Sequence, residues 1–234
     1  MKRLATIEAT APIGVQLIAD LRSRIITGAL QPGMRLSEQE IAVAYGMSRQ
    51  PVREAFIKLA AERLVEIRPQ RGTYVCKIDL FEVEQSQFVR EAVEADIVRA
   101  AARRRNAMQI AELLAQVETQ KQHLAEGGAA FVAMDELFHQ TLAVAAGHAA
   151  VWSHLQPIKM HMDRVRYLTV EEFPRDHLVV QHAAIVDAIA AGDAEAAEAA
   201  VRIHLRGVLN DLKAVEGVSD ALAETIYAFF HERG

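Results

Sequence analysis

The stretch SRQPVREAF, at residues 48–56, decides the fold of the N-terminal third of this chain. Ser48 suits the N-cap of a helix, and Pro51 is tolerated because the first helical turn needs no backbone N–H from it. A short apolar segment and a Gly46-Met47 turn come before the stretch, and a basic hairpin pattern follows it. This order predicts a winged helix-turn-helix, a module that lays one helix in the DNA major groove.

The helices of this module are predicted from spacing and capping signals. Apolar residues recur at helical spacing over 12–27, which predicts a first helix. Ser37 and Glu40 form a capping box at the start of a second helix, and Gly46 permits a left-handed turn at its end. The third helix is expected over 49–63 and buries one apolar face.

The polar face of the third predicted helix carries candidate DNA contacts. Arg49 and Arg53 are four residues apart, so they project from one side of the helix. Arginine binds a guanine edge or a phosphate, and the sequence leaves both open for each residue. Residues 64–77 alternate around a tip at 70–72, which predicts a hairpin that reaches a minor groove. The candidate DNA-binding residues are Arg35, Ser48, Arg49, Gln50, Arg53, Lys58, Arg71 and Gly72.

Composition indicates a globular protein with two differently charged parts. The chain has 234 residues, of which 51% are hydrophobic, and no run approaches the length of a membrane span. The single cysteine, Cys76, excludes an internal disulfide, and the first residues lack a signal-peptide core, so a cytoplasmic location is expected. Residues 1–78 have a net charge of +5 and residues 79–234 a net charge of -10. We therefore expect a DNA-binding domain over 1–78 and a second domain over 79–234.

The second part shows helical patterns without strand patterns, so the whole chain is expected to be mainly α. An N-terminal winged helix-turn-helix with a small β-hairpin wing would precede an all-α bundle of six to seven helices. The predicted bundle helices cover 80–104, 107–125, 130–145, 149–169, 174–191 and 194–214, with a short seventh over 218–231.

Four residues of the bundle form a candidate metal site. Asp135 and His139 lie one turn apart, while His182 and His204 each sit among apolar residues that place them on a buried face. Three imidazoles and one carboxylate suit zinc, nickel, manganese or iron, with zinc the leading candidate. The ordinary alternative is a set of satisfied core histidines, because nine histidines offer many accidental pairings.

The segment PGMRLSEQEIAVAYGMSRQPVREAFIKLAAERLVEIRPQRGTYV resembles the DNA-binding domain of GntR-superfamily bacterial regulators. The likeness covers about residues 12–76, with PGxRLSE, SRxPVREA and RGTxV in order. The resemblance implies a symmetric homodimer on a palindromic operator of double-stranded DNA. It matches Arg49 and Arg53 to the DNA-contacting arginines of the family, and Arg71-Gly72 to the tip of its wing.

Residues 80–215 resemble the FCD effector domain of the FadR-like branch of that superfamily. The likeness rests on Asp135-x-x-x-His139, on His182 followed by Ile185, and on His204. In metal-containing members these four positions bind a divalent ion, whereas other members lack it. Arg90 matches a family arginine that holds an effector carboxylate, although it also stands one turn before Glu94 and could pair with it. Arg164 is a weaker effector candidate, because a solvated position is expected first for Arg164, as it is for His154 and His161.

These observations predict a ligand-responsive transcriptional regulator, and by the more common family behaviour a repressor. A small organic acid bound at the metal-containing cavity would change its DNA affinity. The alternatives are a metal-dependent, hydrolase-like enzyme and a pure metal sensor. An enzyme is not expected, because no motif places a general base or a nucleophile beside the Asp/His site.

Overall fold

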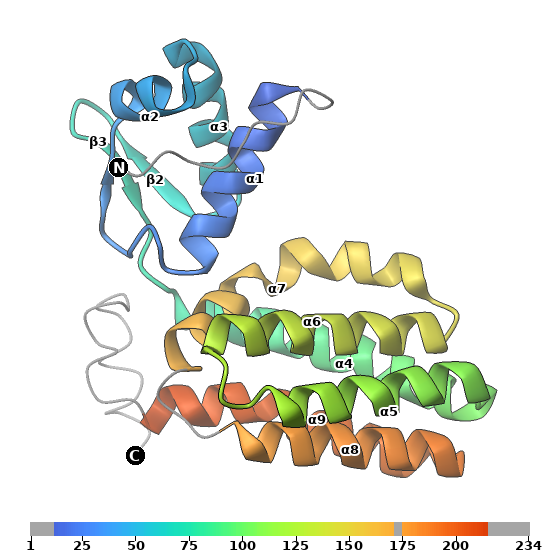
Figure 1. Ribbon diagram of the computed structural model, residues 1–234. Helices are drawn as coiled ribbons and strands as arrows, with labels where there is room; N and C mark the ends of the chain where they lie inside the picture. Colours follow the sequence, from blue (N-terminus) through green and yellow to red (C-terminus); the bar gives the residue numbers. More distant parts are fainter. Residues whose placement is uncertain (1–11, 171–174, 215–234) are drawn as a thin grey trace. The chain divides into compact units, whose positions relative to one another are not determined.

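A computed structural model of the chain describes residues 12–170 and 175–214, with side chains described through residue 207. The chain divides into two compact units between Asp79 and Leu80. Figure 1 shows the elements of both units. The predicted seventh helix over 218–231 lies outside the described residues, as does residue 174, the predicted start of the fifth bundle helix.

The N-terminal unit is a winged helix-turn-helix, as the sequence predicts. Its sheet is antiparallel in the order β1-β3-β2, with Arg35 opposite Tyr74 and Val65 opposite Val75. The strand β1 was not predicted, because two residues are too few to show an alternating pattern. The elements are α1 (Ile13–Ile26), β1 (Arg35–Leu36), α2 (Glu38–Tyr45), α3 (Arg49–Ala61), β2 (Val65–Arg68) and β3 (Gly72–Val75).

Local chemistry explains where these helices begin and end. The Ser37 hydroxyl accepts a hydrogen bond from the Glu40 N–H at 3.3 Å, which is one half of the predicted capping box, and Gly46 ends α2 with a φ of 65°, as predicted. Ser48 is the N-cap residue of α3, as predicted, but its side chain makes no capping hydrogen bond. Pro51, at the third helical position, has no N–H to donate to the Ser48 hydroxyl, which leaves only the Gln50 N–H as a donor in the first turn.

The C-terminal unit is an all-α bundle, which confirms the predicted class for the described residues. Its central helix, α4, packs against α6, α7, α8 and α9, while α5 and α6 form an antiparallel pair, as do α8 and α9 (Figure 1). No helix in the described ranges is long and apolar enough to cross a membrane. The helices are α4 (Leu80–Arg104), α5 (Ala107–Gln122), α6 (Gly128–Ala145), α7 (Ala149–Thr169), α8 (Asp176–Ala191) and α9 (Ala194–Ala214).

The helix ends differ from expectation at the connection between α5 and α6. Helix α5 stops at Gln122 and α6 starts at Gly128, whereas the sequence suggested 125 and 130. A turn in which Glu126 N–H donates to the His123 carbonyl closes the connection, and Gly127 enters α6 in an extended conformation. Asp135 and His139 lie in the middle of α6, away from the shifted helix start, and both face the buried core of the unit.

Candidate functional site

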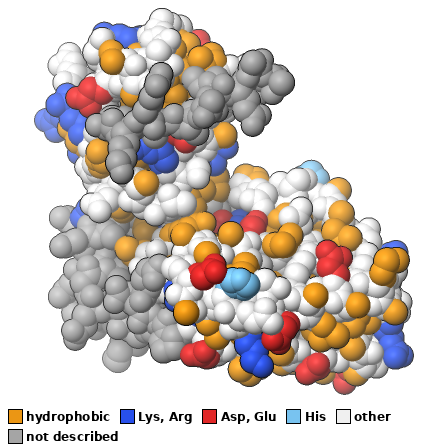
Figure 2. Space-filling model, in the orientation of Figure 1, with side chains coloured by type: hydrophobic (Ala, Val, Ile, Leu, Met, Phe, Trp, Pro, Cys, Tyr) orange, Lys and Arg blue, Asp and Glu red, His pale blue; other side chains and the backbone are white. Residues whose placement is uncertain are grey.

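The outer face of α3 is exposed, while its inner face packs into the N-terminal unit. Val52, Phe56 and Leu59 are buried, and Arg49 and Arg53 are exposed on the other side. The remaining candidates Arg35, Ser48, Gln50, Lys58 and Arg71 are exposed too, and Gly72 is half-buried. Figure 2 shows Lys and Arg side chains gathered where Figure 1 places the β2–β3 hairpin. This surface therefore presents basic and hydrogen-bonding groups to solvent.

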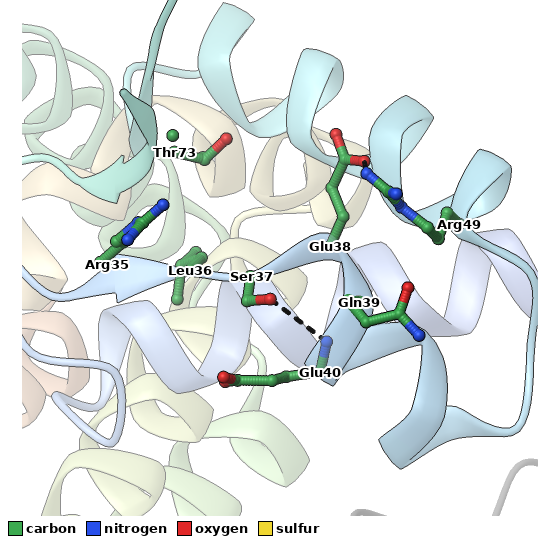
Figure 3. A pocket seen from close by; sticks show the side chains of 9 residues that line it. Arg35, Leu36, Ser37, Glu38, Gln39, Glu40, Arg49 and Thr73 are labelled. Atoms are coloured by element: carbon green, nitrogen blue, oxygen red, sulfur yellow. Dashed lines mark hydrogen bonds and ion pairs between the residues drawn. The ribbon is translucent and has the colours of Figure 1, made fainter. Parts of the chain in front are cut away.

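A pocket of about 590 Å³ brings part of this surface together. It lies between β1, the start of α2, the start of α3 and β3, and its lining includes Arg35, Arg49 and Gly72 (Figure 3). A Cβ atom on Gly72 would stand 2.9 Å from Arg35 Nε, and the residue has a φ of 111°. The positive φ favours glycine at this position, and the missing Cβ leaves room for the Arg35 side chain beside the wing. Arg53, Lys58 and Arg71 do not line this pocket.

Four buried side chains from three helices meet inside the C-terminal unit. Asp135 and His139 come from α6, His182 from α8 and His204 from α9, and one ligand atom of each lies within 4.8 Å of the others. His204 Nε2 is 3.0 Å from His139 Nε2 and 3.2 Å from His182 Nε2. Asp135 Oδ1 is 3.4 Å from His182 Nε2. We call these four residues the Asp/His cluster.

The other ring nitrogen of each histidine faces an oxygen acceptor. His139 Nδ1 lies 2.5 Å from a Glu94 carboxylate oxygen, His182 Nδ1 2.7 Å from Gln120 Oε1, and His204 Nδ1 3.0 Å from Gln181 Oε1. An oxygen acceptor beside Nδ1 favours the tautomer that carries its proton there, and this tautomer turns the Nε2 lone pair toward the centre. Three inward lone pairs repel one another unless a cation or a proton lies between them. The donor set therefore fits a divalent ion.

The sequence did not single out these acceptors. Gln120 stands in a polar stretch and Gln181 in an apolar one, neither with a distinguishing pattern, and Glu94 was recognised only as a partner of Arg90. Arg166, on α7, was also missed, although it forms an ion pair with Asp135. Only the juxtaposition of different helices reveals these four contacts.

Burial and neighbouring charges favour metal-binding protonation states at His182, His204 and Asp135. Burial lowers the pKa of His182, and it lowers the pKa of His204 well below its ordinary value. Burial alone would raise the pKa of Asp135, but Arg166 and His139 bring it well below the usual range. The pKa of Glu94 falls to about 2 because Arg90 and His139 outweigh its burial. Neutral imidazoles and an ionised carboxylate are the forms that bind metal.

The two effector candidates are both buried in this unit. Arg90, with an exposed fraction of 1%, forms an ion pair with Glu94, as its spacing allowed. Its Nη2 has no hydrogen-bond partner among the described residues. Arg164 is 3% exposed and His161 is 8% exposed, so the expectation that they are solvated is wrong. The reason is that α7 is buried around its whole circumference over residues 159–166, while His154 is exposed.

Comparisons with known proteins identify both units as parts of transcriptional regulators. Residues 14–75 match the model of bacterial regulatory proteins of the gntR family, and residues 85–207 match the FCD domain. The HTH-type transcriptional repressor RspR of Escherichia coli K12 is 36% identical over 88% of this chain and 91% of its own length.

Solved structures agree with this assignment. A putative GntR regulator from Rhodococcus sp. RHA1 is 27% identical, with a TM-score of 0.70 over 87% of this chain and 99% of that one. McbR/YncC of E. coli, at 20% identity, has a TM-score of 0.72 over 88% of this chain and 99% of that one, which shows the shared fold. The family and these relatives are regulators, not enzymes.

Proposed function

Because the chain belongs to the GntR family of bacterial regulatory proteins and carries an FCD domain, we propose that it is a transcriptional repressor controlled by a small organic acid. It binds a palindromic operator as a homodimer, and the acid is held beside a divalent metal ion in the C-terminal unit. The convergence of three imidazole Nε2 atoms and Asp135 carries this proposal. Repression as the sign of regulation is supported by the relative RspR, which is named a repressor.

Operator recognition belongs to α3 and the wing in this proposal. Arg49 and Arg53 contact base edges or phosphates in the major groove, with Ser48, Gln50 and Lys58 beside them. Arg35 contacts the backbone next to the wing, and Arg71-Gly72 reaches a minor groove. The proposal is supported by the exposure of these side chains and by the net positive charge of this part of the chain. A dimer places two such helices in adjacent major grooves.

The Asp/His cluster holds the ion through three Nε2 atoms and a carboxylate oxygen of Asp135. Mixed nitrogen and oxygen donors favour zinc, with nickel, manganese and iron as the other candidates. Asp135 also meets Arg166, so one charged group orients the carboxylate while the three imidazoles supply the remaining ligands. A bound ion offers a Lewis-acidic position to an effector carboxylate or hydroxyl.

Arg90 connects the effector to the ion. Its Nε contacts Glu94, and a carboxylate oxygen of Glu94 lies 2.5 Å from His139 Nδ1, so the chain of contacts runs from Arg90 to a metal ligand. The free Nη2 of Arg90 suits one oxygen of an effector carboxylate. Arg164 is the second effector candidate because of its burial in the same unit. An effector that binds one arrangement of the dimer more tightly shifts the population toward it and so changes operator affinity.

Fluorescence anisotropy on DNA from upstream of the gene, across a salt series, tests this function. We expect salt-steep operator binding that Arg53→Ala weakens by about 5- to 150-fold, the range for loss of one bidentate base contact. Arg103→Ala is the matched control, because Arg103 is an exposed arginine of the other unit. Equal affinity for operator and scrambled DNA at every salt concentration would contradict the proposal. Operator affinity that follows free zinc with no organic acid present would instead indicate a metal sensor.

A further inference from the structure

The Arg49 side chain on α3 forms an ion pair with a residue of the neighbouring helix, α2. Its Nη2 lies 2.7 Å from a carboxylate oxygen of Glu38, the first residue of α2. Figure 3 shows the two side chains meeting at the rim of the pocket, with the Glu38 side chain extended toward the start of α3. The first exposed arginine of the recognition helix therefore has a carboxylate partner on the neighbouring helix.

This ion pair contributes little to stability. The side chains of Arg49 and Glu38 are 64% and 29% exposed, and ion pairs in such settings are largely offset by solvation and lost side-chain entropy. A carboxylate on a DNA-binding surface also repels phosphates, so Glu38 weakens general attraction to DNA. Neither stability nor overall affinity accounts for its position beside Arg49.

We infer that Glu38 is a positioning residue that orients the Arg49 guanidinium toward one base edge and so sets operator discrimination. This inference rests on the proposed contact between Arg49 and DNA. A guanidinium has five N–H donors, so one bond to Glu38 leaves enough donors for a bidentate contact with a base. When DNA displaces water from the pocket, the attraction between Glu38 and Arg49 grows, because the local dielectric constant falls. The orientation is therefore firmest when base contacts form.

Glu40 offers a matched control for Glu38. Both are acidic residues of the first turn of α2, where negative charge stabilises the helix N-terminus. The Glu40 side chain extends away from Arg49, whereas that of Glu38 reaches it (Figure 3). Glu40→Gln therefore removes the same charge from the same turn without touching the recognition arginine.

The experiment measures the discrimination ratio in full-length wild type and variants. This ratio is the dissociation constant for scrambled DNA divided by that for operator DNA of equal length. We expect Glu38→Gln to lower the ratio about tenfold, within the range of one bidentate base contact. Glu38→Asp, which keeps the charge but shortens the reach, should lower the ratio as well. Glu40→Gln should tighten binding to both DNAs alike and leave the ratio unchanged.

A double variant separates this inference from the function on which it rests. In an Arg49→Ala background, Glu38→Gln should no longer change the ratio. Operator binding that tightens in Glu38→Gln at least as much as scrambled-DNA binding would overturn the inference, because Glu38 would then compete with DNA for Arg49. An equal loss of ratio in Glu40→Gln would overturn it too. If Arg49→Ala itself leaves operator affinity unchanged, the proposed recognition by Arg49 fails instead.

Discussion

The two units use carboxylates in opposite settings. In the N-terminal unit, Glu38 meets Arg49 at the surface, where the side chains are 29% and 64% exposed. In the C-terminal unit, Glu94 meets His139 with side chains that are 2% and 0% exposed. An exposed charge is available to a large external partner, whereas a buried charge must be satisfied by neighbours or by a bound ion. The difference separates a DNA-reading surface from an internal ligand site.

The largest expected effect comes from metal removal, which should act on one unit only. An ion present at a thousand times its dissociation constant stabilises the folded state by about 4 kcal/mol. We expect a chelator to lower the melting temperature of the C-terminal unit by roughly 10 °C, and zinc to restore it. The winged helix, followed by hydrogen exchange, serves as the internal control. Equal loss of protection in both units would contradict a site confined to the bundle.

The next effect is the pH dependence of the metal-free protein. Burial lowers the pKa values of His182 and His204 from 6.5. Below pH 6.5 these two imidazoles are therefore protonated in the unfolded chain while they stay neutral in the folded unit. The free energy of unfolding should therefore fall on acidification, by up to about 1.4 kcal/mol per pH unit for each histidine. Asp135 and Glu94, whose pKa values are lowered, add a further loss below their ordinary values.

Hydrogen exchange at several pH values checks this dependence in each unit. All nine histidines follow residue 79, so the N-terminal unit should show no slope between pH 6.5 and pH 5. A bundle whose protection stays constant over the same interval would mean that the two imidazoles are not held neutral.

A smaller effect is expected from the acceptor behind His182. Gln120→Ala removes the oxygen that fixes the proton on His182 Nδ1, and the loss of such a contact lowers metal affinity by about 10- to 100-fold. Gln122→Ala, an exposed glutamine of the same helix, should leave metal affinity unchanged. Competition titration with a zinc chelator measures both. Indistinguishable affinities in the two variants would show that Gln120 does not support the ligand.

The smallest effect is expected at Lys58, which is exposed beyond the first turns of α3. A lysine that contacts only phosphate should, when replaced by alanine, weaken operator and scrambled DNA by the same factor. The slope of log affinity against log salt concentration should fall by about one. A selective loss of operator affinity would place Lys58 at a base edge and extend the recognition surface along the helix.

Capping signals predicted the helix boundaries of the winged helix well because they are local. Ser37 and Gly46 act as their residue types suggest. Ser48 takes the predicted N-cap position without a capping hydrogen bond, and the sequence already shows that Pro51 removes one of the two possible donors. The strand β1 could not be predicted, since it forms only by pairing with a distant strand, β3.

The Asp/His cluster shows the same division between local and distant information. The spacing of Asp135 and His139, with two histidines in apolar segments, suggested that the four residues meet, and the resemblance to the FCD domain selected them from nine histidines. The acceptors Gln120 and Gln181 were not predictable, because their contacts depend on how separate helices pack. Arg164 was misjudged for the same reason, since its burial depends on what surrounds α7.

Metal content of the purified protein tests the central claim most directly. Wild type, Arg53→Ala and His182→Ala, loaded with zinc and dialysed, would be analysed by elemental mass spectrometry. We predict about one ion per chain in wild type and Arg53→Ala, and almost none in His182→Ala, because the three imidazoles and the one carboxylate together supply the protein ligands of a single ion. Equal metal content in His182→Ala and wild type, or no uptake of zinc, nickel, manganese or iron by wild type, would contradict the account.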